Sequence, residues 1–223
     1  MIDICVIPAR GGSKRIPKKN IKNFLKFPII KYTIKNALKS NLFDKIIVST
    51  DDKKIAKLSK SFGAEILIRS KKLSNDKTGT NEVICNTIKY YEKEFRIKRV
   101  CCLYPTSVFC NEKILRTAFK KLDKKTKYVF SITKYSHPIF RSFKIKNNKI
   151  SMLFPSKEKI RTQDLPKTFH DASQFYLGWK EAWKKHKKIF NENSKFVEID
   201  ENKTQDIDNL ADWKLAEIKY LNK

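Results

Sequence analysis

The sequence contains few of the residues that build disulfide frameworks and zinc sites. Its five cysteines are odd in number, include no CxxC pair and lie mostly within apolar segments, and only three histidines are present. This composition argues against a zinc site. It favours buried thiols in a reducing compartment over a disulfide framework, and we therefore expect a cytoplasmic protein.

Long apolar segments are also missing. No apolar run approaches the roughly 20 residues that a membrane-spanning helix needs. The first residues, MIDICVIPARGG, include an acid and lack the basic start of a secretory signal. We expect neither a signal peptide nor a membrane partner.

Acidic residues are scarce, so the chain carries a large positive charge. Lys and Arg number 50 against 23 Asp and Glu, which gives a formal net charge of +27. Such a charge is typical of nucleic-acid-binding proteins, and a basic RNA-binding protein without enzymatic activity is one hypothesis. However, only eight of the 50 cations are Arg, and Lys is spread along the whole chain. We interpret the excess as Lys decoration of a surface and expect no nucleic-acid partner, although the field can gather anionic substrates.

The first half of the chain alternates short apolar runs with amphipathic segments. We predict strands at residues 2–7, 44–50, 65–69 and 99–104. We predict helices at residues 28–38, 52–62 and 81–95. This order is typical of an α/β fold with a mainly parallel sheet covered by helices. Because ligands of such sheets bind at the carboxyl ends of the strands, the loops after the first and fourth strands should face one pocket.

The pattern changes after residue 127. A strand at 128–132 is followed by an irregular stretch with three prolines. The sequence KNNK at 146–149 in this stretch predicts a hairpin turn. We interpret this stretch as an inserted β-rich flap at about 135–170 within a single domain that spans residues 1–223. The remaining elements are predicted as a strand at 174–178, a helix near 179–188, a strand at 195–199 and a closing helix from about 210.

The strongest chemical signal is the loop after the first predicted strand, IPARGGSKRIPKKN, residues 7–20. A glycine pair lets backbone N–H groups approach a phosphate, and Arg10, Lys14 and Lys19 supply cations for a polyphosphate. The spacing fits neither GxxxxGK[ST] nor GxGxxG. The alternative is a Lys-rich surface turn, but the strand, proline, glycine pair and cations together favour phosphate binding.

A second signal is the acidic doublet of Asp206 and Asp208. Residues i and i+2 of an extended segment project to one side, so the two carboxylates can hold a divalent cation. Mg²⁺ prefers few protein oxygens together with waters and substrate phosphates, and Mn²⁺ is the alternative metal. An acidic pair can instead cap the helix that follows, so this interpretation stays open at this point.

These motifs resemble those of the sugar-acid cytidylyltransferases, the family of the CMP-sialic acid synthetases. The resemblance is carried, in chain order, by IPARGGSKRIPKKN, VSTDD (48–52), CCLYPTSVF (101–109), RTQDLPKTFHDASQFYLG (161–178) and TQDIDNLADW (204–213). The TGT at 78–80, the Tyr before Pro105-Thr106 and the FHDASQFYLG stretch look most like the pseudaminic acid cytidylyltransferases within that family.

The resemblance implies a three-layer, Rossmann-like nucleotidyltransferase fold with a β-rich dimerisation flap and a homodimer. It implies transfer of CMP from CTP to the anomeric hydroxyl of a nine-carbon acidic sugar, with release of pyrophosphate. Pseudaminic acid is the expected sugar, and sialic or legionaminic acid is the alternative. Tyr104 is the discriminating residue, because CMP-sialic acid synthetases place Gln at this position.

The resemblance, together with residue chemistry, assigns roles to the candidate site residues. The catalytic set is Arg10, Lys14 and Lys19, which would stabilise the departing pyrophosphate, and Asp208. Asp206 and Asp208 form the metal pair. The nucleotide-binding set is Ala9, Arg10, Gly11, Gly12, Ser13, Lys14, Asn20, Arg69 and Thr80. The sugar-binding set is Tyr104, Thr106, Arg161, Gln163, His170, Gln174 and Tyr176.

Two of these assignments have alternatives. Thr78 to Thr80 also fits a helix N-cap, and His170 is either a general base or a structural histidine.

Overall fold

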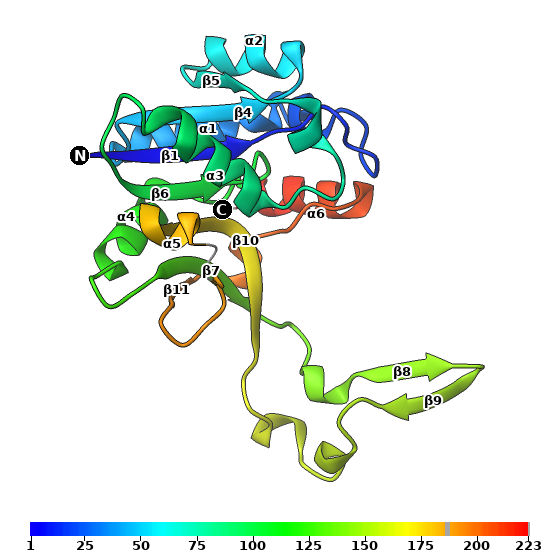
Figure 1. The fold of residues 1–223 in the computed structure, drawn as a ribbon. Coiled ribbons are helices and arrows are strands. Elements are labelled where there is room, and N and C mark those ends of the chain that lie inside the picture. Colours follow the sequence, from blue (N-terminus) through cyan, green and yellow to red (C-terminus); the bar gives the residue numbers. More distant parts are fainter. Residues whose placement is uncertain (186–187, 223) are drawn as a thin grey trace.

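The computed structural model describes all residues except 186, 187 and 223. A seven-stranded sheet forms its centre, with the strand order β11-β7-β10-β6-β1-β4-β5 (Figure 1). The strands are β1 (Ile2–Pro8), β4 (Lys45–Thr50), β5 (Glu65–Ile68), β6 (Ile97–Leu103), β7 (Tyr128–Lys134), β10 (Phe169–Trp179) and β11 (Lys195–Glu198). Only β10 pairs antiparallel with its neighbours in this sheet. The predicted, mainly parallel sheet is confirmed.

Helices cover both faces of the sheet and give three layers. Alternate residues of a strand point to opposite faces, and β1 divides in this way. Cys5 and Ile7 pack in a core with α1 (Ile29–Ser40), α2 (Lys53–Ser61) and α4 (Glu112–Lys121). Ile4 and Val6 pack in a second core with α3 (Thr80–Tyr91) and α5 (Lys180–Lys184). The predicted α/β fold class is therefore confirmed.

A third, smaller core lies at the carboxyl end of the strands. It joins the short hairpin of β2 (Asn23–Phe24) and β3 (Phe27–Pro28) to the closing helix α6 (Leu210–Leu221). Phe24 contacts the rings of Trp213 and Tyr220 edge-on, with centroids 5.8 and 5.5 Å apart. This packing fixes the last segment of the chain beside the loop that follows β1.

The local signals for α2 are confirmed, whereas one helix was missed. Asp52 caps α2, since its Oδ1 accepts from the N–H groups of Lys54 at 2.7 Å and Ile55 at 3.0 Å. Gly63 follows the helix with φ of 100°, a conformation that favours glycine. The missed helix is α4, whose apolar face, made of Ile114, Leu115, Ala118 and Phe119, packs on the core beside β1 and β7 through Leu115 and Ala118. The predicted helix near 179–188 is shorter: α5 ends at Lys184, and residues 186 and 187 lie outside the described residues.

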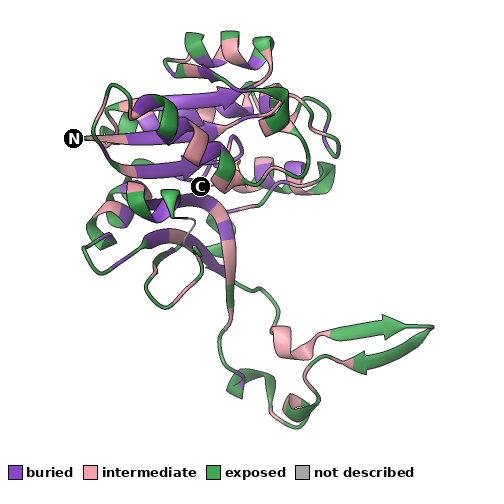
Figure 2. Cartoon of the chain, in the orientation of Figure 1, coloured by how far each residue is buried: buried purple, intermediate pink, exposed green. Residues whose placement is uncertain are grey.

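The segment between β7 and β10 leaves the body of the molecule. It contains a hairpin of β8 (Phe143–Lys146) and β9 (Lys149–Met152) that lies away from the sheet (Figure 1). Its turn residues Asn147 and Asn148 have φ of 51° and 58°, as a two-residue turn with two left-handed positions requires. The KNNK stretch thus does form a turn. Figure 2 shows that both strands are exposed. We call residues 136–168 the excursion.

The strand β10 contains a large irregularity where it enters the body. Asp171 pairs with Ile132 and Tyr176 pairs with Phe130, so five steps along β10 oppose two along β7. Ser173, inside this bulge, has φ of 52°. In a regular strand, residues five apart point to opposite faces. Here the bulge lets the Tyr176 hydroxyl donate to the Asp171 carboxylate.

None of the helices in the described part of the chain is long and apolar enough to span a bilayer.

Candidate active site

A cavity of about 420 Å³ opens where the loops after β1 and β6 meet the bulge of β10. The sequence predicted that the loops after these two strands would face one pocket, and they do. The lining residues include Arg10, Ser13, Lys14, Arg15, Lys19, Asn20, Tyr104, Thr106, Asp171, Ser173, Tyr176, Asp206 and Asp208. Most of the predicted catalytic and metal residues therefore lie around one space.

Two cations of the loop after β1 are held by one carboxylate. Arg10 Nη1 lies 2.6 Å from Asp76 Oδ1, and Lys14 Nζ lies 2.5 Å from Asp76 Oδ2. These hydrogen bonds lower the pKa of Asp76, with Lys14 the larger cause and Arg10 the second. A carboxylate bridging two cations occupies them as one anionic group would. Arg10 and Lys14 are thus arranged to bind one anionic group together.

The loop after β1 also contacts the late acidic doublet directly. Lys19 Nζ donates to the carbonyl of Ile207 at 2.8 Å, across 188 positions of sequence. Arg15 Nη2 lies 2.7 Å from Asp208 Oδ1. Burial lowers the pKa of Lys19, and the nearby Asp208 and Asp206 oppose this effect. The two motifs that the sequence indicated as separate signals form one site.

The acidic doublet has the alternation that its spacing predicts. Ile207 is fully buried in the third core, while Asp206 and Asp208 on either side of it both line the cavity. Asn209, not Asp208, caps α6, since its Oδ1 accepts from the N–H groups of Ala211 and Asp212. The helix-cap alternative is therefore wrong for Asp208.

The two carboxylates fit a divalent cation. Burial raises the pKa of Asp206, and the adjacent Asp208 raises it further. A cation would relieve both the desolvation and the repulsion. Within the described residues no group of three or more His, Cys, Asp or Glu is arranged for a metal. Mg²⁺ needs only one or two carboxylates when substrate phosphates and waters complete its shell.

An aromatic wall closes the other side of the cavity. The rings of Tyr104 and Tyr176 meet edge-on with centroids 5.8 Å apart. The Tyr104 hydroxyl lies 3.1 Å from Thr80 Oγ1, and the Tyr176 hydroxyl donates to Asp171. Burial raises the pKa of both tyrosines, so each keeps its hydroxyl proton. Thr80 is the first residue of α3, whose N-cap is Gly79 and has no side-chain cap.

Three functional candidates were missed by sequence reasoning: Arg15, Asp76 and Asp171. Asp171 lines the cavity and also accepts from the N–H of Ser173 at 2.9 Å. It entered the sequence reasoning only as part of the motif at 161–178, with no role assigned. The position of Asp171 depends on the bulge in β10. Nothing in the sequence indicates this bulge, because serine is not a residue that typically marks a left-handed backbone position. Asp76 and Arg15 are ordinary exposed charges until their long-range partners are known.

Part of the glycine loop differs from the prediction, because three of its residues do not line the cavity. Ala9 is buried, and its N–H donates to the carbonyl of Ser49 at 2.9 Å. The N–H of Gly11 donates to Asp51 Oδ1 at 3.0 Å. A Cβ on Gly11 would lie 2.9 Å from Asp52 Oδ2, whereas Gly12 has open space. Gly11 therefore allows close contact with the VSTDD stretch rather than offering a free amide.

The two polar candidates for the nucleotide base lie differently. Asn20 lines the cavity, and its Nδ2 donates to the carbonyl of Arg10 at 2.9 Å. Arg69 is buried and faces a separate cavity, with its Nε donating to Ser74 Oγ at 3.1 Å. Burial lowers the pKa of Arg69. Arg69 does not line the candidate cavity, but its guanidinium interacts electrostatically with Asp51 and with Arg10 of the loop after β1.

The predicted sugar-binding set divides into two groups. Tyr104, Thr106 and Tyr176 line the cavity. Arg161 and Gln163 lie exposed on the excursion, where Arg161 pairs with Asp164 at 3.3 Å, and neither lines the cavity of its own chain.

The two remaining members of the set lie near the base of the excursion. Gln174 is buried in β10; its Nε2 donates to the carbonyl of Ala172 at 3.1 Å, while its Oε1 has no hydrogen-bond partner among the described residues. His170 packs on the ring of Tyr135, with centroids 4.6 Å apart, and borders a different cavity.

Comparison with known proteins places this site in a family. Residues 4–221 match the family described as cytidylyltransferase. The chain belongs to the cytidylyltransferase family. Members of this family are generally Mg²⁺-dependent, and the buried, mutually repelling Asp206 and Asp208 are compatible with that requirement.

Several curated cytidylyltransferases resemble the chain along its length. A pseudaminic acid cytidylyltransferase of Campylobacter jejuni is 40% identical over 224 residues, covering 99% of this chain and 97% of the relative. A Helicobacter pylori protein named pseudaminic acid cytidylyltransferase and UDP-2,4-diacetamido-2,4,6-trideoxy-beta-L-altropyranose hydrolase is 36% identical, covering 97% of this chain and 42% of that protein. An N-acylneuraminate cytidylyltransferase of Escherichia coli is 28% identical, covering 96% of this chain and 51% of that protein.

Solved cytidylyltransferase structures share the fold. A CMP:2-keto-3-deoxy-manno-octonic acid synthetase complexed with CTP matches with a TM-score of 0.72 at 15% identity, covering 99% of this chain and 98% of that one. A 4-diphosphocytidyl-2C-methyl-D-erythritol synthase of Anaerococcus prevotii matches with a TM-score of 0.63 at 14% identity, covering 99% and 98% of the two chains. The nucleotidyltransferase fold implied by the sequence motifs is confirmed.

Proposed function

We propose that this cytidylyltransferase transfers CMP from CTP to the anomeric hydroxyl of pseudaminic acid and releases pyrophosphate. The single observation that carries the proposal is the meeting of the cationic loop and the acidic doublet around one cavity, through Lys19 and Ile207 at 2.8 Å and Arg15 and Asp208 at 2.7 Å. Full-length identity of 40% to pseudaminic acid cytidylyltransferases supports the choice of substrates.

Catalysis in this proposal depends on positioning and on charge. The sugar hydroxyl attacks the α-phosphate in line with the departing pyrophosphate, and a site that fixes both reactants lowers the entropic part of the barrier. Arg10 and Lys14 exchange Asp76 for the phosphates, while Lys19 adds a half-buried positive charge beside them. Together they offset the negative charge that develops on the leaving group.

We assign Asp206 and Asp208 as the residues that hold Mg²⁺, with Mn²⁺ as the alternative. When bound, the ion would neutralise phosphate charge and lower the pKa of a coordinated hydroxyl. Arg15 pairs with Asp208 in the free protein and keeps that carboxylate oriented toward the cavity. Burial and Asp208 raise the pKa of Asp206, so ionising this carboxylate costs more than in a free aspartate, and a bound cation would offset that cost.

The acceptor sugar is assigned to the aromatic side of the cavity. Tyr104 and Tyr176 keep their protons and offer O–H groups, and Thr106 adds a hydroxyl. Tyr104 stands where CMP-sialic acid synthetases have Gln, so it is the residue on which sugar choice should depend. Asp171 orients Tyr176 and is the sugar-side carboxylate of the site.

The remaining assignments concern the whole chain. We propose that residues 1–223 act as one nucleotidyltransferase domain in the cytoplasm, and that the flap at about 135–170 packs against a second copy in a homodimer. Exposed apolar side chains on the hairpin support this packing. In such a dimer Arg161 and Gln163, which do not reach their own cavity, would be available to the partner's cavity.

The test is pyrophosphate release from CTP and Mg²⁺ with a panel of nonulosonic acids. We expect the highest kcat/KM with pseudaminic acid, lower values with legionaminic and N-acetylneuraminic acid, and no release without a sugar. A preference for N-acetylneuraminic acid would rule out the assigned sugar. Absence of CTP-dependent release, with salt-steep binding to any RNA, would support the basic RNA-binding hypothesis instead.

A further inference from the structure

A second cavity lies next to the candidate active site, on the other side of Asp206. Its volume is about 380 Å³, and Asp206 lines both cavities. Its walls come from the end of β7, the start of β10, the segment before the acidic doublet and α6. Neither the cations of the loop after β1 nor Tyr104 and Tyr176 line this second cavity, so the roles given to them do not extend to it.

Two buried threonines in this cavity have unused hydroxyl groups. Thr133 is 3% exposed and Thr204 is 4% exposed, and both line the cavity. Neither hydroxyl has a hydrogen-bond partner in the described part of the chain. A buried polar group without a partner costs free energy, so most such groups in folded proteins are satisfied. Both hydroxyl oxygens are themselves buried, so a ligand would reach them only after rotation about χ1, a rotation that breaks no hydrogen bond.

One of the two lysines that line this cavity, Lys219, already uses its ammonium group within the protein. Lys219 Nζ donates to the carbonyls of Glu201 at 2.7 Å and Thr204 at 2.9 Å, and to Gln205 Oε1 at 3.0 Å. These three bonds use all its N–H donors and fix the segment that carries Thr204. The first cavity, by contrast, has four cations from the loop after β1.

The charged groups of the lining offset one another: Glu201 and Asp206 oppose Lys134 and Lys219, which leaves no excess positive charge for a phosphate. Besides the two threonines, Ser136, Asn202 and Gln205 contribute hydroxyl and amide groups. Neutral donors and acceptors of this kind suit the hydroxyl and acylamino groups of a sugar, whereas a triphosphate needs charge. The position beside Asp206 places such a ligand next to the transferred phosphate.

We propose that the acceptor sugar extends past Asp206 into this second cavity, where the hydroxyls of Thr133 and Thr204 bind its hydroxyl or acylamino substituents. The two threonines are then specificity-determining residues for the sugar, remote from the phosphates. This inference rests on the proposed function, because it needs a sugar as the acceptor.

The test replaces each hydroxyl with a methyl group of the same shape. For Thr133→Val and Thr204→Val we expect the KM for the sugar to rise about three- to tenfold, as loss of one hydrogen bond implies, with the KM for CTP unchanged. The melting temperature of the free protein should stay constant or rise, because an unsatisfied buried hydroxyl is removed. A better-folded protein that binds sugar less well is a result that a merely structural threonine would not give.

Ser59→Ala is the matched control. Ser59 also has a buried hydroxyl without a partner among the described residues, but it lies in α2 and lines neither cavity. We expect no change in either KM. An unchanged KM for the sugar in either valine variant would overturn the inference while leaving the proposed function intact. Equal rises in both KM values with a lower melting temperature would also overturn it.

Wild-type pyrophosphate release is measured first with the same sugars, which separates the two proposals. If the wild-type protein is inactive with every sugar, the proposed function fails and this inference fails with it.

Discussion

The body of the molecule and the excursion treat their apolar residues in opposite ways. The body buries Ile4, Val6 and Ile7 completely under helices on both faces of the sheet. The hairpin of the excursion leaves Phe143, Ile145 and Ile150 at 55%, 74% and 66% exposure. Figure 2 shows the same contrast along the chain. The body therefore completes its own core, whereas the hairpin presents apolar surface that only another surface can cover.

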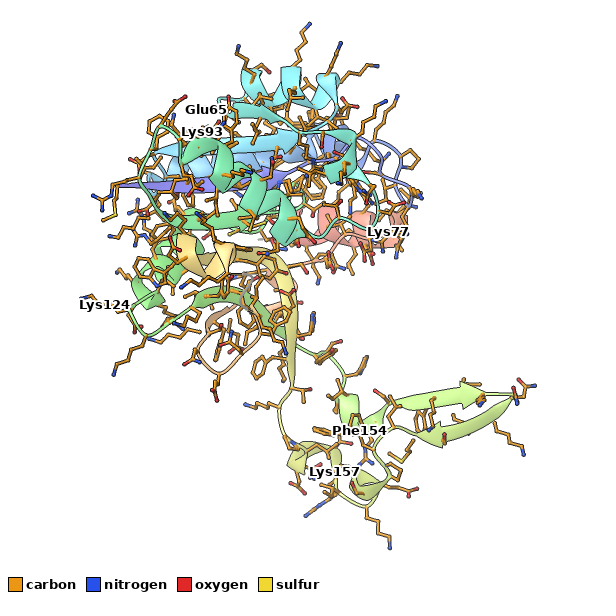
Figure 3. The ribbon with its side chains drawn as sticks, in the orientation of Figure 1. Glu65, Lys77, Lys93, Lys124, Phe154 and Lys157 are labelled. Carbon is orange, nitrogen blue, oxygen red and sulfur yellow. The ribbon has the colours of Figure 1, made fainter. Side chains whose placement is uncertain are left out.

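The excursion nevertheless has ordered contacts of its own beside the hairpin. The guanidinium of Arg141 donates to the carbonyls of Glu158, at 2.9 Å, and Ile160. The rings of Phe140 and Phe154 meet edge-on with centroids 5.2 Å apart. Figure 3 shows Phe154 and Lys157 close together beside the hairpin, at the end of the excursion that is well separated from the sheet. The excursion is therefore held in shape by its own contacts, as the pocket is by the contacts of the body. Substitutions in the two regions should therefore change different quantities.

The largest effect is expected in the body, at the acidic doublet. Asp208→Asn should lower turnover about 10²–10³-fold. The substitution keeps the shape of the side chain but removes one of the two negative charges proposed to hold the cation beside the phosphates. Chelation of divalent metal should lower wild-type turnover in the same way. Steady-state pyrophosphate release is the measurement, and size-exclusion elution should not change.

Glu112→Gln is the control for this change. Glu112 lies at the first turn of α4 and is exposed, away from the cavity. Its turnover should equal that of the wild type. Near-normal turnover of Asp208→Asn would remove the metal assignment.

The hairpin should change assembly instead. Ile145→Lys combined with Ile150→Lys places two charges on a paired, exposed position of β8 and β9. Light scattering should then report the 26.3 kDa single chain in place of a dimer. If Arg161 of the arm serves the partner's cavity, the KM for the sugar should also rise about tenfold.

Lys144→Ser on the same hairpin is the matched control, since Lys144 pairs with Ser151 and contributes no apolar surface. It should leave both the mass and the KM unchanged. A double-lysine variant that stays dimeric would show that the hairpin is not the assembly surface.

A smaller effect is expected for Asp76, which bridges Arg10 and Lys14 in the free site. Asp76→Asn removes the carboxylate that the triphosphate must displace, so the KM for CTP should fall by about two- to fivefold, within the range of exposed ion pairs. Asp164→Asn removes a comparable exposed carboxylate from Arg161 on the excursion and should not alter this KM. A higher KM for CTP in Asp76→Asn would mean that Asp76 supports the nucleotide rather than competing with it.

The smallest effect concerns the stability of the free protein. Burial and Asp208 raise the pKa of Asp206 above its usual value, so the folded state holds this proton more tightly than the unfolded state. The free energy of unfolding should therefore fall as pH rises from the unfolded pKa through the raised folded pKa, and the ionised carboxylate destabilises the fold at neutral pH. Asp206→Asn, in chelator, should melt a few degrees higher than the wild type at pH 7.

Calorimetry across pH 4–8 checks this sign. The difference between wild type and Asp206→Asn should shrink toward acid, where Asp206 is protonated in both states. A lower melting temperature for the variant at pH 7 would mean that the carboxylate stabilises the free fold.

Sequence reasoning reached those parts of the site that depend on local pattern. The run from Ile2 to Pro8, the cap at Asp52 and the alternation around Ile207 are each set by near neighbours, and each is found where it was expected. The shared pocket of the loops after β1 and β6 also followed, because parallel strands end at one edge of the sheet.

The parts that were missed depend on long-range contacts, apart from α4. Asp76 becomes a partner of Arg10 only through a contact across 66 positions. Gly11 looks like an open phosphate loop until Asp51 takes its N–H. Physical contact, not composition, decides these two cases. The helix α4 does carry an apolar face, with Leu115 and Ala118 in the core, and its helical spacing was a local signal that went unused.

The bulge in β10 has a consequence for how this chain can vary among descendants. Between Asp171 and Tyr176, β10 contains more residues than the facing part of β7. These extra residues bring the side chains of Asp171 and Tyr176 to the same face of the sheet. Deleting or inserting a single residue there would turn Tyr176 to the opposite face while the hydrogen-bonded ladder re-formed. Such a lineage would keep a folded enzyme and lose its sugar-side wall, so length changes in this stretch should be far rarer than substitutions.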